Sequence, residues 1–166
     1  MTRWTVRAAL ALYVVTLVLR LAAPGRRELA RAAWTTGCVL FLAHVAAAFH
    51  YFHGWSHGDA YRETARQTGE MVGTYWGGGL YLNYLFTLVW AADVAYWWWR
   101  GTKGYAARPR WIDLLLHGFM VFMAFNAVVV FESGLVRAAG VAATVLLVSL
   151  TVYRLRSSGN AVARTA

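Results

Sequence analysis

Four of the five histidines are clustered in one stretch of fourteen residues. They are His44, His50, His53 and His57. At about 100° per residue, the last three share one face of a continuous helix, while His44 is displaced by about a third of a turn. A neutral imidazole is the commonest metal ligand, and nearby carboxylates can add oxygen ligands. The spacing therefore predicts a metal site, whose candidate ligands are His50, His53, His57, Asp59 and Glu63.

The pattern of the last three histidines resembles one histidine box of the membrane fatty-acid desaturases and hydroxylases. The resemblance covers eight residues and implies a metal-dependent membrane enzyme. That family has several such boxes on the cytoplasmic side, whereas this sequence has one, at an end of the protein that we expect outside the cell. An interpretation without metal fits the same residue types, because the histidines lie beside Tyr51, Phe52 and Trp55, as interfacial polar and aromatic residues do.

His117, the fifth histidine, suggests a second kind of cofactor site. Membrane cytochromes of the b type hold haem iron between histidines on two helices. The depth of His117 matches that of His44 better than that of His50, so a single haem between His44 and His117 is the one haem arrangement that the sequence allows. The cofactor prediction stays open between a transition metal and haem b, with His44 and His117 as the haem ligands.

Two ionisable residues are expected inside the protein near its cytoplasmic end. Asp93 and His117 each lie about six residues inside that end of a predicted span, at matching depth on neighbouring helices. A carboxylate that accepts a hydrogen bond from an imidazole satisfies both groups in a low dielectric, and Asp113, one turn before His117, shares its face. We expect a polar clasp between two helices, with a proton path or a ligand site as the alternative.

These candidates are carried by long apolar segments. Apolar residues make up 60% of the chain and charged residues 14%, whereas soluble domains carry roughly a quarter charged residues. The apolar residues form runs long enough to cross a bilayer. The sequence predicts one all-α domain over residues 1–166, an integral membrane bundle of about five transmembrane helices. The spans are about 4–23, 34–53, 80–99, 111–131 and 138–153, with a short interfacial helix, Ala60–Glu70, in the loop 54–79.

Basic residues predict the orientation of the chain. Eleven lie on the side of the connections 20–31 and 100–110 and the tail 154–166, against five on the other side. The positive-inside rule then predicts a multi-pass protein of the cell membrane with a cytoplasmic C-terminus and an external loop 54–79. The net charge of +9 indicates contact with anionic lipid of the bilayer, and no segment has the basic and aromatic surface of a nucleic-acid-binding protein.

Other signatures of catalysis are missing from the sequence. No nucleophile elbow and no phosphate-binding loop occurs, and Cys38 alone allows no intrachain disulfide. The first apolar segment resembles a secretory signal but is expected to remain as a membrane anchor. With 9 Trp, 9 Tyr and 8 Phe, some aromatic surface is expected to pack against a membrane protein partner or a pigment-like ligand. The sequence favours a noncatalytic subunit of a membrane assembly, with a histidine-rich outer end able to bind a metal or contact a redox cofactor. The alternatives are a haem redox protein that uses His44 and His117 and a metal-dependent membrane enzyme that uses His50, His53 and His57.

Overall fold

All elements that the structure describes are helices. The computed structural model describes residues 2–127, 138, 140–142 and 145. Its helices are α1 (Thr2–Ala22), α2 (Arg27–Phe52), α3 (His57–Val72), α4 (Gly79–Ala106) and α5 (Arg110–Phe125). The all-α class predicted from the sequence is therefore confirmed for this part of the chain.

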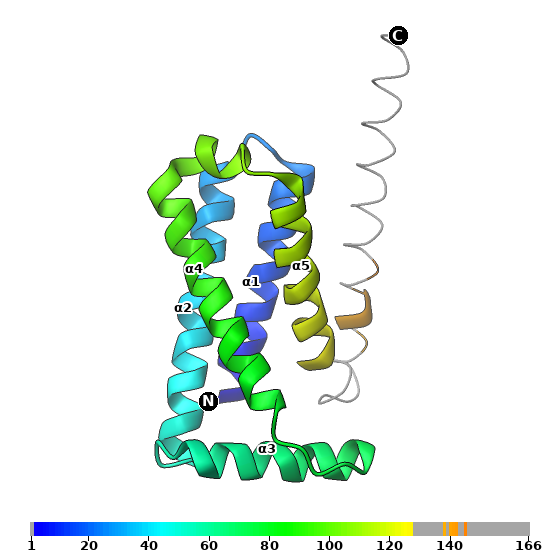
Figure 1. Cartoon of the computed structure of the whole chain (residues 1–166). Helices are drawn as coiled ribbons and strands as arrows, with labels where there is room; N and C mark the ends of the chain where they lie inside the picture. Colours follow the sequence, from blue (N-terminus) through cyan, green and yellow to red (C-terminus); the bar gives the residue numbers. More distant parts are fainter. Residues whose placement is uncertain (1, 128–137, 139, 143–144, 146–166) are drawn as a thin grey trace.

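Helices α1, α2, α4 and α5 run alongside one another, and α3 lies across one end of them (Figure 1). The turn between α1 and α2 and the connection between α4 and α5 lie together at the opposite end. We call this the basic end, defined by residues 20–31 and 100–110, and we call the other the α3 end. The two basic connections that the sequence analysis assigned to one side of a membrane thus lie at one end of the bundle.

Small residues let α1 and α2 approach closely. A Cβ atom added to Gly37 of α2 would lie 3.3 Å from the carbonyl oxygen of Ala9 of α1 and 3.0 Å from the indole of Trp90 of α4. Trp90 is fully buried and packs against Trp34, with 4.9 Å between the ring centres. The close packing of Trp90 and α1 against α2 therefore requires a glycine at position 37.

The chain turns sharply between α2 and α3. Gly54 and Trp55 have positive φ angles of 52° and 61°, which end an α-helix. Ser56 then caps α3, because its side chain accepts a hydrogen bond of 3.2 Å from the backbone N–H of Asp59. The expectation of one continuous helix through His57 is therefore wrong, since the backbone leaves the helical conformation at Gly54.

A kink at Gly101 turns the last residues of α4 across the basic end. Gly101 has a φ of 64° and a ψ of 174°, a conformation that favours glycine. Tyr105, beyond the kink, stacks on Trp97, before the kink, with ring centres 3.9 Å apart and ring planes 6° from parallel. Both rings are buried. The stacking holds the connection against the bundle and carries Arg108 inward.

Within the part of the chain that the structure describes, two helices are long and apolar enough to cross a membrane, and they match the first two expected spans. They are Trp4–Ala22 and Arg27–Phe52. The third expected span lies in α4, which contains tyrosines, tryptophans and Asp93 among its apolar residues. The fourth begins with α5 but extends beyond residue 127, and most of the fifth, 138–153, lies outside the described residues. The short helix expected at residues 60–70 is present within α3.

Candidate functional site

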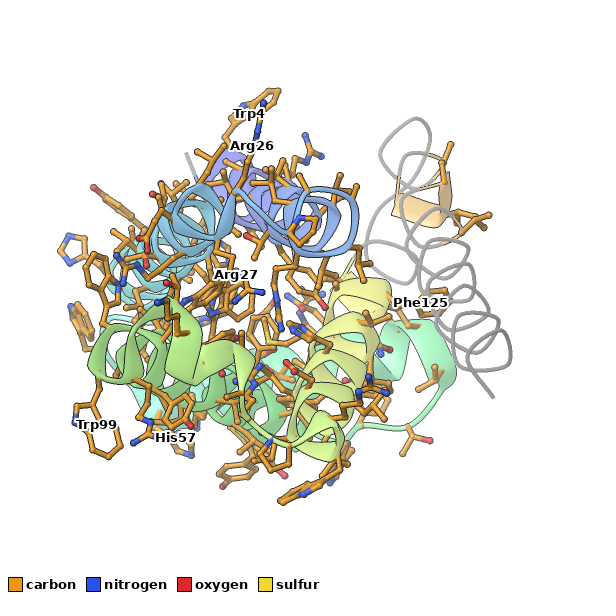
Figure 2. All side chains as sticks on the ribbon, turned by 90° about the horizontal axis from the view of Figure 1, so that it is seen from above. Trp4, Arg26, Arg27, His57, Trp99 and Phe125 are labelled. Carbon is orange, nitrogen blue, oxygen red and sulfur yellow. The ribbon has the colours of Figure 1, made fainter. Side chains whose placement is uncertain are left out.

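A group of ionisable side chains is enclosed near the basic end. We call it the ionic network, and its members are Arg20, Asp93, Arg108, Asp113 and His117. The side chains of Arg108 and Asp93 are only 2% and 7% exposed. Seen from above in Figure 2, side-chain nitrogen and oxygen atoms lie in the space between the helices. Because isolated charges are costly to bury, the partners of each group decide whether the arrangement is stable.

Asp93 is the most deeply buried acceptor of the ionic network. One carboxylate oxygen accepts hydrogen bonds from the indole N–H of Trp34 at 2.9 Å and from the hydroxyl of Tyr105 at 2.7 Å. The other oxygen pairs with the guanidinium of Arg108. Asp93 thus joins α2, α4 and the connection after α4, and a buried cation matches its negative charge.

Arg108 bridges two carboxylates. Its guanidinium pairs with Asp93 and donates to Asp113, from Nε at 3.0 Å and also from Nη2. Nη2 donates to the hydroxyl of Tyr105 at 2.9 Å as well, and the guanidinium lies 4.0 Å from the centre of that ring. A planar guanidinium presents its donors in a fixed fork, so it holds both carboxylates in a defined geometry. Arg108 therefore ties α5 to α4.

Arg20 and His117 close the ionic network on the side of α1. Arg20 donates from Nη2 to Asp113 at 2.9 Å, and its Nη1 meets Nε2 of His117. A guanidinium has donors only, so Nε2 of His117 must accept, which leaves the ring neutral with its proton on Nδ1. The ring of His117 also packs against Tyr13 of α1, with 6.1 Å between the centres. His117 therefore serves as an acceptor for Arg20 and not as a cation.

The ionic network is electrically balanced. Two guanidinium groups face two carboxylates, and the imidazole is neutral. Each charged group lies beside an opposite charge, which offsets much of the cost of burial. Contacts from α1 (Arg20), α2 (Trp34), α4 (Asp93) and α5 (Asp113) meet here. The arrangement can act as a clasp that fixes four helices relative to one another.

The predicted direct pair between Asp93 and His117 is wrong. Both residues belong to the ionic network, but the partner of Asp93 is Arg108 and the partner of His117 is Arg20. Guanidinium groups are the better partners for buried carboxylates, because they are always charged and donate several hydrogen bonds. The predicted proximity of Asp113 to His117 on one face of α5 is confirmed, with 3.8 Å between Oδ1 and Nε2.

Sequence reasoning missed both arginines of the ionic network. In the sequence, Arg20 looks like a contact to lipid headgroups, and Arg108 looks like part of an exposed connection. One available signal was charge balance, because Asp93 and Asp113 fall inside predicted spans and buried carboxylates need cations. The kink at Gly101, which turns Arg108 inward, has no comparable signal in the sequence.

The structure separates the histidines of the predicted metal site. His50 faces Tyr51, with 4.8 Å between the ring centres, and His53 lies at the C-terminal end of α2. His57, on α3, shares a hydrogen bond of 3.0 Å with the hydroxyl of Tyr84 of α4. Across the described residues, no three side chains of the His, Cys, Asp and Glu types are grouped to hold a metal ion. The predicted ligand set is therefore not gathered.

The two acidic candidates of the metal site are engaged within α3. The hydrogen bond with Ser56 is the largest cause that lowers the pKa of Asp59. Glu63 pairs with Arg66 at 2.6 Å, and the hydrogen bonds of that guanidinium lower the pKa of Glu63 to about 2. The nearby His53 makes a smaller contribution in the same direction to the pKa of both carboxyls. Both carboxylates thus stabilise α3 by local contacts.

His44 and His117 do not face each other as a haem pair. The ring of His117 lies 6.0 Å from the ring of Trp34, which is ten residues, or about 15 Å, from His44 along α2. His44 packs instead against Phe41, with 6.1 Å between the ring centres. The predicted span begins at residue 34, whereas α2 begins at Arg27, so His44 lies farther from the basic end than expected.

Comparisons with known protein families, curated proteins and solved structures found no match to this chain.

Proposed function

We propose that the chain is a noncatalytic subunit of a membrane assembly, with a bundle of five transmembrane helices that is locked by the ionic network. The distribution of side chains carries this proposal. Large aliphatic side chains are exposed on all four described helices of the bundle: Val15, Val39, Leu42, Leu85, Leu88, Leu114 and Leu115. Asp93 and Arg108, in contrast, are buried. Lipid favours this arrangement, because apolar side chains meet acyl chains and charged groups pair in the interior.

The positions of aromatic side chains support α4 as a span. Tyr81 and Trp98 are both 55% exposed and lie near the two ends of α4, 17 positions apart (98 − 81), which is about 26 Å along a helix. The hydrocarbon core of a bilayer is about 30 Å thick, and Tyr and Trp favour its two boundaries. Together with α5 and the apolar segment 138–153, α4 completes the five spans that we propose.

For orientation, we place the basic end in the cytoplasm and the α3 end outside. The α1–α2 turn and the α4–α5 connection lie at one end of the bundle, and the N-terminus and α3 lie at the other (Figure 1). Short connections rich in Lys and Arg stay on the cytoplasmic side of a membrane. A fifth span then brings the C-terminus to the cytoplasm.

The ionic network and the outer aromatic surface support the role of a subunit. The charged groups of the ionic network are one another's partners, so they hold the helices in fixed positions. Trp99 and Trp111 are 78% and 62% exposed on α4 and α5, and Figure 2 shows Trp99 pointing away from the bundle. Aromatic side chains are enriched where proteins meet. We therefore assign contact with a membrane protein partner to this aromatic surface.

Cysteine labelling tests the membrane part of the proposal. Cells produce the chain with Cys38→Ser and with either Gly58→Cys on α3 or Lys103→Cys at the basic end. A maleimide that does not cross membranes is expected to label Gly58→Cys in intact cells and Lys103→Cys only after the cells are opened. Labelling of both positions from one side would overturn the topology, as would recovery of the unmodified protein from a detergent-free soluble fraction.

Purification in a mild detergent tests the subunit part. We expect the chain to migrate with a second membrane protein in a fixed ratio. The variant Trp99→Ala/Trp111→Ala is expected to lose that partner and keep its own unfolding midpoint, whereas Trp76→Ala, at the α3 end, keeps the partner. A particle that contains this chain alone would contradict the assignment.

A further inference from the structure

The two ends of the bundle differ in surface charge. The basic end exposes five cationic side chains and one carboxylate: Arg26, Arg27, Arg100, Lys103 and Arg110, with Glu28. A sixth cation, Arg31, has a side chain that is only 19% exposed. By sequence, the α3 end has four cationic and three anionic side chains between residues 2 and 127: Arg3, Arg7, Arg62 and Arg66, with Asp59, Glu63 and Glu70. The excess is thus four exposed positive charges (5 − 1) at the basic end and one positive charge (4 − 3) at the α3 end.

The two ends also differ in how the charges are paired. At the α3 end, Arg66 pairs with Glu63 and with Glu70. At the basic end, the single carboxylate, Glu28, is occupied by Arg31 and by a hydrogen bond from Thr102. The side chains of three basic-end cations make no hydrogen bond, ion pair or contact with an aromatic ring in the described part of the chain. These unpaired cations are Arg26, Lys103 and Arg110.

Contacts between distant segments join the two connections of the basic end. The hydroxyl of Thr102 donates to Glu28 at 3.1 Å across 74 positions of the sequence. The indole of Trp98 donates to Thr35 at 3.0 Å, and the guanidinium of Arg31 lies 4.0 Å from the centre of the Trp98 ring. The unpaired cations of both segments therefore lie at the same end of the bundle.

Three exposed tryptophans lie near the basic end. Trp98, Trp99 and Trp111 are 55%, 78% and 62% exposed near the basic end. Trp side chains favour the boundary between acyl chains and headgroups. With these rings at that boundary, the cations of the basic end lie at the depth of the lipid phosphates.

We propose that the basic end binds the phosphate groups of anionic phospholipids through Arg26, Lys103 and Arg110. This inference rests on the proposed position of the chain in a membrane. Unpaired cations at the depth of the phosphates attract anionic headgroups. At physiological salt this attraction acts over about 8 Å and is largely screened at longer distances. The α3 end, where three carboxylates offset most of the positive charge, binds no such lipid in preference to zwitterionic lipid.

The test compares the unfolding midpoint of the full chain in nanodiscs of phosphatidylcholine with that in nanodiscs that also contain phosphatidylglycerol. We expect phosphatidylglycerol to raise the midpoint by about 3 °C or more at low salt, and by less at high salt. Failure of the chain to enter nanodiscs of either composition would overturn the proposed membrane function itself. Entry into both with equal midpoints would overturn only the lipid site.

Two variants, one at each end of the bundle, locate the binding surface. The variant Arg26→Gln/Lys103→Gln/Arg110→Gln is expected to lose most of the midpoint increase caused by phosphatidylglycerol. The control Arg62→Gln/Arg66→Gln removes two cations from the α3 end and is expected to keep that increase. If the triple variant keeps the full increase, the assignment is wrong.

Two further measurements separate a lipid site from a site for free phosphate. Inorganic phosphate at matched ionic strength, added to phosphatidylcholine nanodiscs, is expected to leave the midpoint unchanged, and an equal increase would assign the site to free phosphate instead. Native mass spectrometry counts the phosphatidylglycerol molecules that each protein retains. We expect Lys103→Gln alone to retain fewer than the wild type, and an unchanged count in this single variant would contradict the proposal even if the triple variant does not fold.

Discussion

Asp93 carries a negative charge at a depth where an unpaired carboxylate costs several kcal/mol. Three donors offset this cost, from Trp34, Tyr105 and Arg108. Two of the three come from beyond the kink at Gly101. The stability of this carboxylate thus depends on how the chain folds back at the basic end, and not on the helix that carries it.

We expect Asp93→Asn to lower the free energy of unfolding by about 3 to 5 kcal/mol, because Arg108 then keeps a buried positive charge with one carboxylate fewer. The measurement is denaturation in detergent micelles. The control is Glu28→Gln, which makes the same change in a carboxylate that is 67% exposed and is expected to cost less than about 1 kcal/mol. Equal losses in the two variants would show that the Asp93 pair is not a clasp.

Helices α2 and α5 each contain one glycine, Gly37 and Gly118, and the space around these two positions differs. At Gly37 of α2, an added Cβ meets Trp90 at 3.0 Å and the backbone of Ala9 at 3.3 Å. At Gly118 of α5, nothing lies within 4 Å of an added Cβ. The first glycine is required by the close packing of three helices, whereas the second faces open space.

We expect Gly37→Leu to lower the free energy of unfolding by about 1 to 3 kcal/mol or more, because the side chain forces α1 and Trp90 away. Gly118→Leu is expected to be neutral or stabilising, since a helix interior prefers leucine to glycine by about 1 kcal/mol. Both variants are measured by the same micelle denaturation. A destabilising Gly118→Leu together with a silent Gly37→Leu would contradict the packing of α1, α2 and α4.

The stability of α3 is expected to depend on pH. The pKa of Glu63 is lowered from 4.5 to about 2 by hydrogen bonds from Arg66 and Gln67. A lowered pKa adds stability that is present above the ordinary pKa and is lost as the pH falls through the lowered pKa. We therefore expect hydrogen-exchange protection of α3 in the full chain to be constant above about pH 5 and to fall between about pH 4.5 and 2.

The exchange experiment is corrected for intrinsic amide rates, which also change with pH. The control is Glu63→Gln, which removes the titrating group and is expected to weaken the pH dependence. A wild-type α3 whose protection does not change across this range would show that its ion pairs add no stability.

For the whole molecule, the arrangement of helices decides which cofactors the histidines can hold. The structure places His44 and His117 at different depths and sets His57 on a separate helix from His50. We expect the natively purified protein to show no Soret band and to contain no zinc or iron in a fixed ratio. Optical spectroscopy and metal analysis make the measurement.

Each positive result in that experiment selects a different function. Iron with a Soret band selects a haem protein, and zinc or iron without one selects a metal site; either result contradicts the expectation that the chain binds no metal or haem. His53→Ala serves as the control variant. Replacement of this histidine is expected to leave both the metal content and the unfolding midpoint of the protein unchanged.

Local sequence patterns were sufficient to predict the helical class, the two long apolar helices, a helix at residues 60–70 and the connections that carry the cations. These features follow from composition and from the lengths of apolar runs, which act over neighbouring residues. The breaks after Gly54 and at Gly101 were harder to predict, because a glycine in a helical pattern is compatible with both a continuous and a broken helix.

The partners of the ionisable groups became known only from the folded chain. The sequence analysis paired Asp93 with His117 by depth, but the kink at Gly101 brings Arg108 to Asp93, and α1 brings Arg20 to His117 across 97 positions of the chain. Such partners depend on the directions of whole helices after each turn. A turn of the backbone by one residue redirects every side chain beyond it, so long-range pairing cannot be derived from local spacing.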